Sequence, residues 1–168
     1  MKKHFYWAFV VIATALIQTT WLDAVRVQGV VPDLTLLLVV YFAITDGEER
    51  AMFTGVLGGM YQDVASDAVL GHYVLCNVVV GYGVGRMSRR LLSDHPAIKT
   101  ALVLCAALVH GILYTAILYV QKPDISAIRT IGVSVIPGAF YTALVTPVAL
   151  FLLSRVFQNR KAVQGEAA

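Results

Sequence analysis

Residues 34–62 read LTLLLVVYFAITDGEERAMFTGVLGGMYQ, which is two uncharged apolar runs on either side of a short charged turn. The runs cover residues 34–45 and 51–62, so each has 12 residues. A helix of that length rises about 18 Å, whereas bilayer hydrocarbon is about 30 Å thick and takes roughly 20 residues to cross. Two short crossings and one re-entrant hairpin are therefore both compatible with these two windows.

Four longer uncharged stretches flank this pair and complete the pattern. They cover residues 4–22, 68–85, 100–121 and 130–154, and each is long enough to cross a bilayer as a helix. Hydrophobic residues make up 58% of the chain and charged residues 14%, against about 25% charged in a soluble domain. The sequence predicts an all-α integral membrane protein, a six-transmembrane-helix bundle that forms a single domain over residues 1–168.

Lysine and arginine gather on one side of the predicted bundle. If the N-terminus is cytoplasmic and each window crosses once, ten of the 13 cations lie inside. Only Arg26, Lys122 and Arg129 lie outside. Because Lys and Arg beside short loops resist translocation, this bias predicts a multi-pass protein of the inner membrane with both termini in the cytoplasm. The basic inner loop around residues 86–99 is placed to meet anionic membrane lipids.

Glycine spacing predicts where helices touch. Gly55 and Gly59 lie at i and i+4 in the third window, and Gly81 and Gly85 repeat that spacing in the fourth. Small residues at this spacing let two helix backbones approach closely, and in lipid that packing replaces the missing hydrophobic driving force. We expect helix contacts at both pairs.

Acidic residues at window boundaries raise the question of function. Asp33 precedes an apolar run and is placed to interact with the N-terminus of that helix. A bare carboxylate at the membrane centre costs on the order of 3 kcal/mol, so Asp63 needs an interface, a polar cavity or a partner. One interpretation places Asp63 at the outer surface, with Ser66 or Asp67 capping the next helix. The others are a polar cavity and a contact with another membrane protein.

His110 is the second polar residue of interest, because it lies 11 residues past Lys99, about 16 Å into the fifth window. A neutral imidazole that is hydrogen-bonded to Tyr114, Asn77 or a carbonyl group would explain a histidine at this depth without a catalytic or metal-binding role. A metal site would need a second ligand at i+3 or i+4, and no other histidine is so placed. The sequence also has no His-Glu-x-x-His helix and no Gly-x-Ser-x-Gly elbow, so it predicts neither a metal nor an enzyme.

The segment 31–71 resembles the bacterial rod-shape-determining membrane protein family MreD. Members show a Pro-Asp or Pro-Asn before an apolar helix, a glycine-rich helix that ends in Asp, and a Leu-Gly shortly afterwards. One departure is Asp67, which stands where the family usually has glycine. The positions that match the family pattern, as a partner-binding or structural motif, are Pro32, Asp33, Gly55, Gly59, Asp63, Ser66 and Gly71.

The resemblance implies a non-enzymatic component of the cell-elongation machinery that binds the single-span protein MreC and helps organise peptidoglycan synthesis. It also implies association with MreB, RodA and its transpeptidase through that complex, and no cofactor or nucleic acid. The family's fold is similar to the substrate-binding subunits of energy-coupling-factor vitamin transporters.

Three functional hypotheses follow from these patterns. The first is docking, in which the glycine faces and the windows at 34–45 and 51–62 form a surface for the MreC membrane helix. The second is a small-solute (vitamin) binding subunit that uses the polar residues near Asp63 as a pocket. The third is an ion or proton pathway through Asp63 and His110.

Overall fold

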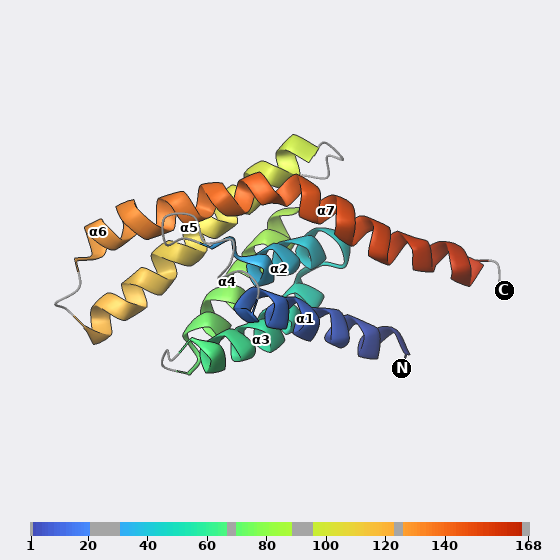
Figure 1. The fold of residues 1–168 in the computed structure, drawn as a ribbon, viewed down its shortest axis with the longest axis horizontal. Helices are drawn as coiled ribbons and strands as arrows, with labels where there is room; N and C mark the ends of the chain where they lie inside the picture. Colours follow the sequence, from blue (N-terminus) through green and yellow to red (C-terminus); the bar gives the residue numbers. More distant parts are fainter. Residues whose placement is uncertain (1, 21–30, 67–69, 89–95, 123–125, 166–168) are drawn as a thin grey trace.

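The computed structural model describes residues 2–20, 31–66, 70–88, 96–122 and 126–165, and every regular element within these ranges is a helix (Figure 1). Helices α6, η2 and α7 follow one another without a break and form one long helix. The structure confirms the prediction of an all-α membrane protein. The elements are α1 (Lys2–Thr20), α2 (Leu34–Thr45), α3 (Glu48–Ala65), α4 (His72–Ser88), α5 (Pro96–Gln121), α6 (Ala127–Thr130), the π-helical turn η2 (Ile131–Val135) and α7 (Ile136–Gly165).

The short helix α2 lies at the centre of the bundle. It has the 12 residues of the second apolar window, and it packs against α1, α3, α4, α5 and α7. Its sequence is apolar on all sides, as expected for a helix that is buried all round. A helix enclosed in this way contacts protein rather than lipid, so its length need not match the bilayer. Its buried residues are Thr35, Leu36, Leu37, Leu38, Val39, Val40, Phe42 and Ala43.

Helix α3 is longer than the apolar window that predicted it. It covers Glu48–Ala65, 18 residues, instead of 51–62, because the charges that bound the window are compatible with a helix. Glu48 and Glu49 lie in its first turn, where negative charge favours the helix dipole. Gly47, with φ of 91°, makes the tight turn between α2 and α3, a conformation that glycine adopts at little cost.

Two helices are long and apolar enough to cross a membrane by length and composition, Ala97–Gln121 and Ala127–Arg155. The sequence predicted four such windows. Helix α1 has 19 residues, as many as the window at 4–22, and α4 has 17, one fewer than the window at 68–85.

The π-helical turn η2 ends two residues before Pro137. Proline lacks an N–H and its ring clashes with the carbonyl group four residues earlier, here that of Val133. Val135, the last residue of the turn, packs against Gly111 of α5.

The helices alternate in direction through the bundle. Figure 1 shows the start of α1 and the end of α7 at the same end of the molecule. We call the opposite end, where α4 begins and α5 ends, the distal end.

Candidate functional site

Asp33 joins four helices near the distal end. As predicted, it is the N-cap of α2, and its Oδ1 accepts a hydrogen bond from the Leu36 N–H at 2.9 Å. The same oxygen accepts from Gln62 Nε2 at 3.2 Å and from Gln18 Nε2 at 3.3 Å. The Asp33 N–H donates to Thr142 Oγ1 on α7 at 3.1 Å. One residue therefore connects α1, α2, α3 and α7.

Two amide side chains extend this arrangement on either side of Asp33. Gln18 Oε1 accepts from both the N–H and the hydroxyl of Thr35, at 2.8 and 2.9 Å. Gln62 Oε1 accepts from Asn77 Nδ2 of α4 at 2.9 Å. Pro32, before the cap, is buried, and its ring fixes the backbone that leads into α2. We call the following residues the polar cluster: Gln18, Asp33, Thr35, Gln62, Asn77 and Thr142.

Asp63 caps the start of α4. Its Oδ2 accepts from the N–H groups of Gly71 at 2.9 Å and Val74 at 3.3 Å, and its Oδ1 accepts from that of Tyr73 at 2.9 Å. Gly71, with φ of 102°, has no side chain with which to cap the helix, so a carboxylate from α3 satisfies these donors. The negative charge also lies at the positive end of the α4 dipole.

This geometry corrects the interpretation in which Ser66 caps the next helix, because Asp63 itself is the cap. The residue is only 2% exposed. Ser66 does not cap α4, because its hydroxyl donates to the Gln62 carbonyl oxygen at 2.6 Å. Asp67 lies outside the described residues. Asp63 therefore stabilises the α3–α4 connection.

The glycine pairs lie at close helix contacts, as their spacing predicted, and the two helices are α3 and α4. A Cβ on Gly55 would lie 2.9 Å from the Asn77 carbonyl carbon, and one on Gly59 would lie 2.6 Å from Val74 Cα. A Cβ on Gly85 would lie 2.6 Å from Glu48 Cα. Since these neighbours are backbone atoms, the two helices are in direct contact there. The expectation that Gly55 and Gly59 receive the MreC helix is wrong for this structure, because α4 already occupies that face.

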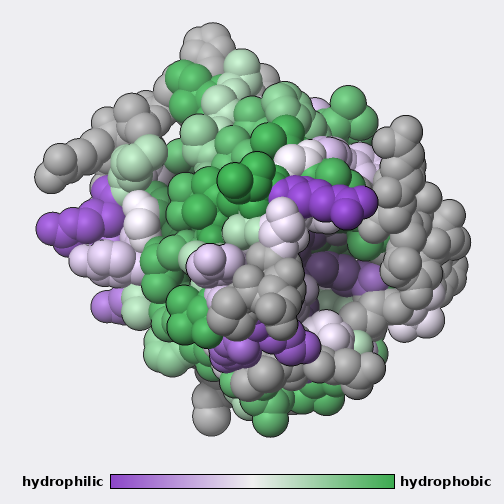
Figure 2. Space-filling view, turned by 90° about the vertical axis from the view of Figure 1, so that its left-hand side faces the viewer, coloured by the Kyte–Doolittle hydropathy of each residue, from purple (hydrophilic) through white to green (hydrophobic). Residues whose placement is uncertain are grey.

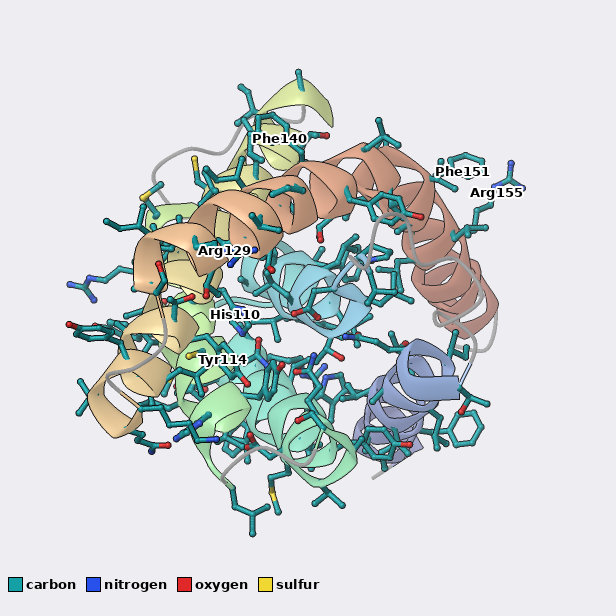
Figure 3. All side chains as sticks on the ribbon, turned by 60° about the vertical axis from the view of Figure 1, so that its left-hand side comes forward. His110, Tyr114, Arg129, Phe140, Phe151 and Arg155 are labelled. Atoms are coloured by element: carbon teal, nitrogen blue, oxygen red, sulfur yellow. The ribbon has the colours of Figure 1, made fainter. Side chains whose placement is uncertain are left out.

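His110 is buried on α5 and packs among aromatic rings. Its ring stacks on Tyr73 of α4, with centroids 6.1 Å apart and planes at 29°. Tyr73 also packs against Tyr114 at 4.7 Å, and Figure 3 shows His110 and Tyr114 on the same stretch of α5. The predicted bond from His110 to Tyr114, Asn77 or a carbonyl group is not made by Nε2, which has no partner in the described part of the chain. Sequence reasoning missed Tyr73, whose only signal is its position after the Gly71 turn.

No group of three or more His, Cys, Asp or Glu residues could hold a metal ion within the described ranges. Both carboxylates of the site already accept hydrogen bonds from helix ends and amide side chains. What the arrangement does chemically is hold helices together through hydrogen bonds in a low-dielectric environment, where such bonds are strong.

Comparison with curated proteins and with solved structures gives no match, so the likeness to energy-coupling-factor subunits stays a prediction. A family model described as "rod shape-determining protein MreD" matches residues 2–156, nearly the whole chain. The polar cluster, the Asp63 cap and the glycine contacts all lie within that match. The chain belongs to the MreD family of rod shape-determining proteins.

Proposed function

We propose that this chain is a non-enzymatic scaffold of the rod-shape machinery, which binds MreC in the inner membrane and helps organise peptidoglycan synthesis. The observation that carries the proposal is the family match over residues 2–156. The geometry supports a scaffold role, because the carboxylates of Asp33 and Asp63 accept hydrogen bonds from N–H groups at helix N-termini. In this proposal both termini lie in the cytoplasm and the distal end faces outward, in agreement with the distribution of Lys and Arg.

The outward face of α4 is the surface on which we place the MreC membrane helix. Leu75, Val79, Gly83 and Met87 follow one another at intervals of four residues, and all four are exposed. Residues at this spacing lie on one side of a helix. A Cβ on Gly83 would meet nothing within 4 Å, so Gly83 leaves room for another backbone. Small residues on exposed membrane helices favour such close approach.

Co-purification from membranes tests both the function and the surface. The full chain is co-expressed with MreC, and the amount of MreC retained is measured for wild type, Gly83→Leu and Gly132→Leu. We expect wild type to retain MreC and Gly83→Leu to retain at least tenfold less. Gly132 is the matched control, because it also has open space around it but lies on η2.

Each outcome decides a different part of the proposal. If wild type does not retain MreC, the docking function is wrong. If Gly83→Leu retains as much MreC as Gly132→Leu, the α4 surface is wrong while the function stands. MreB, RodA and its transpeptidase are expected in the same preparation through MreC, so they should be lost together with it in Gly83→Leu.

A further inference from the structure

The end of α5 and the start of α6 carry the two most exposed large apolar side chains of the described residues. Val120 is 80% exposed and Ile128 is 88% exposed. Helix α6 packs only against α5 and η2 among the described helices, so no other described helix covers it. We call this place the α5–α6 tip, and Figure 1 shows it at the left edge of the distal end. The tip consists of Tyr119, Val120, Lys122, Ile128 and Arg129.

Each of these apolar side chains lies beside an exposed cation. Lys122 follows Val120 by two residues, and Arg129 follows Ile128 directly. Neither cationic side chain makes a hydrogen bond, an ion pair or a ring contact within the described part of the chain. Helices α5, α6 and η2 contain no Asp or Glu, and Asp124 lies outside the described residues. Figure 2 faces this end of the molecule and shows strongly hydrophilic side chains next to strongly hydrophobic ones.

Helix length places the tip at a headgroup layer of the membrane. A helix rises about 35 Å from Lys99 to Lys122 and about 39 Å from Arg129 to Arg155, at 1.5 Å per residue. Bilayer hydrocarbon is about 30 Å thick, and the headgroup regions bring the total to about 40–45 Å. The cations at the two ends of these helices therefore lie level with the two headgroup layers. With the termini in the cytoplasm, Lys122 and Arg129 lie at the outer layer.

This position selects the chemistry of what covers the tip. Exposed aliphatic side chains just inside a headgroup layer contact acyl chains, and cations level with that layer are attracted to lipid phosphate. Arginine also forms two parallel hydrogen bonds to a phosphate group. Three residues join Lys122 to Ser126, so the Cα atoms of these two lie at most about 15 Å apart. A lipid with net negative charge fits both the apolar and the cationic side chains.

We propose that the α5–α6 tip binds an anionic phospholipid, with Lys122 and Arg129 on its phosphate group and Val120 and Ile128 against its acyl chains. Tyr119, which is 49% exposed, adds an amphipathic ring of the kind that gathers at membrane–water interfaces. This site is separate from the α4 surface proposed for MreC.

The opposite ends of the same two helices provide a matched control. Arg155 lies over the Phe151 ring, 5.1 Å from its centroid, and Figure 3 shows this pair far along α7 from Arg129. Lys99 is half-buried and also interacts within the chain. Replacing Lys99 and Arg155 by glutamine therefore removes the same charge from the same helices and leaves the tip unchanged.

Quenching of a fluorophore by brominated lipids tests the site on the full chain. The substitutions Cys105→Ser and Ile128→Cys allow bimane labelling at position 128, because the other cysteine, Cys76, is buried. The protein is reconstituted in phosphatidylcholine, and part of the lipid is replaced by brominated phosphatidylglycerol or by brominated phosphatidylcholine. We expect position 128 to prefer the anionic lipid at least threefold. Lys122→Gln with Arg129→Gln should abolish that preference while both lipids still quench.

The control variants decide whether the tip itself selects the lipid. Lys99→Gln with Arg155→Gln should keep the preference, and so should Lys122→Arg with Arg129→Lys, which retains both charges at the tip. A label on the native Cys105, which is exposed on α5, should be quenched equally by both lipids.

Three results would overturn the proposal. Equal quenching by the two lipids at position 128 would mean that the tip contacts lipid without selecting its charge. An equal loss of preference in both pairs of glutamine substitutions would mean that the total charge of the protein attracts the lipid. No quenching by either lipid would mean that water or another protein covers the tip. MreC is absent from this assay, so the result is independent of the docking experiment.

Discussion

Two antiparallel helix pairs in this molecule are held together in different ways. In the α3–α4 pair the backbones touch at Gly55, Gly59 and Gly85, and Asp63 of one helix caps the other. In the α5–α7 pair the helices are long and apolar, most of their residues face outward, and the glycine contact is made by a side chain, Val135 against Gly111. Short helices with polar ends thus depend on close, specific contacts, whereas helices long enough to cross hydrocarbon do not.

Of the substitutions that compare the two helix pairs, the one that adds a single carbon atom at Gly59 should lower the free energy of unfolding most. In Gly59→Ala the new Cβ would lie 2.6 Å from Val74 Cα and 2.7 Å from Val74 N. Backbone atoms cannot turn away as a side chain does, so α3 and α4 must separate and strain their other contacts. We expect a loss of about 3 kcal/mol in the free energy of unfolding, measured by denaturant titration in mixed micelles.

Gly83→Ala is the control for that substitution. It makes the same change on α4, where a Cβ meets nothing within 4 Å, and in a helix interior alanine is the better residue by about 1 kcal/mol. Gly83→Ala should therefore be neutral or slightly stabilising. Equal destabilisation by the two variants would contradict the contact between the α3 and α4 backbones.

The next effect concerns the cap of α4. Asp63→Ala leaves the N–H groups of Gly71, Tyr73 and Val74 without their acceptor, and losing a helix cap of this kind costs about 2 kcal/mol. Asp63→Asn keeps one acceptor oxygen and should lose roughly half as much. Thermal unfolding in detergent gives the order wild type, Asn, Ala.

The same pair of variants separates the cap from an ion pathway. If Asp63 carried ions, Asp63→Asn would abolish flux in proteoliposomes without changing stability. A capping carboxylate predicts the opposite result, with reduced stability and no flux in the wild type. An Asp63→Asn protein as stable as wild type would contradict the capping role.

A smaller loss in the free energy of unfolding is expected from a substitution in the middle of the polar cluster. Gln62→Leu removes the link between Asp33 and Asn77 and leaves Asn77 Nδ2 buried without an acceptor, which costs about 1.5 kcal/mol. A double-mutant cycle with Asp33→Ala, which removes the accepting oxygen, isolates the contact, and residues in one network couple by about 0.5 kcal/mol or more. Strict additivity of the two substitutions would mean that the observed bond contributes nothing.

Local patterns in the sequence predicted the parts of the fold that depend on neighbours along the chain. The 34–45 window became α2 with the same bounds, and Asp33 became its cap, because an apolar run and a cap lie next to one another in sequence. The glycine pairs predicted a close contact for a similar reason, since the spacing itself marks the face. The spacing does not identify the partner helix. For Gly55 and Gly59 the partner is α4 of the same chain.

The parts that were missed depend on contacts between distant residues. Ser66 and Asp67 lie nearer in sequence to the start of α4 than Asp63 does, and local rules therefore favoured them as caps. The actual cap comes from a buried position of α3, which only the packing of the two helices brings to Gly71. The stacking of His110 on Tyr73 joins residues 37 positions apart, and no period in the sequence marks it.

The smallest effect should come from Gly111→Ala, which tests the other half of the comparison. The new Cβ would meet Val135, chiefly its Cγ1 atom, so the contact involves a side chain that is partly exposed at the π-helical turn. The valine can shift, and alanine favours the helix by about 1 kcal/mol, so the net change should stay within about 1 kcal/mol. The measurement is the same denaturant titration that is used for Gly59→Ala. A loss as large as that of Gly59→Ala would show that α5 and α7 also depend on close packing, and the contrast between the two helix pairs would then reduce to their polar contacts alone.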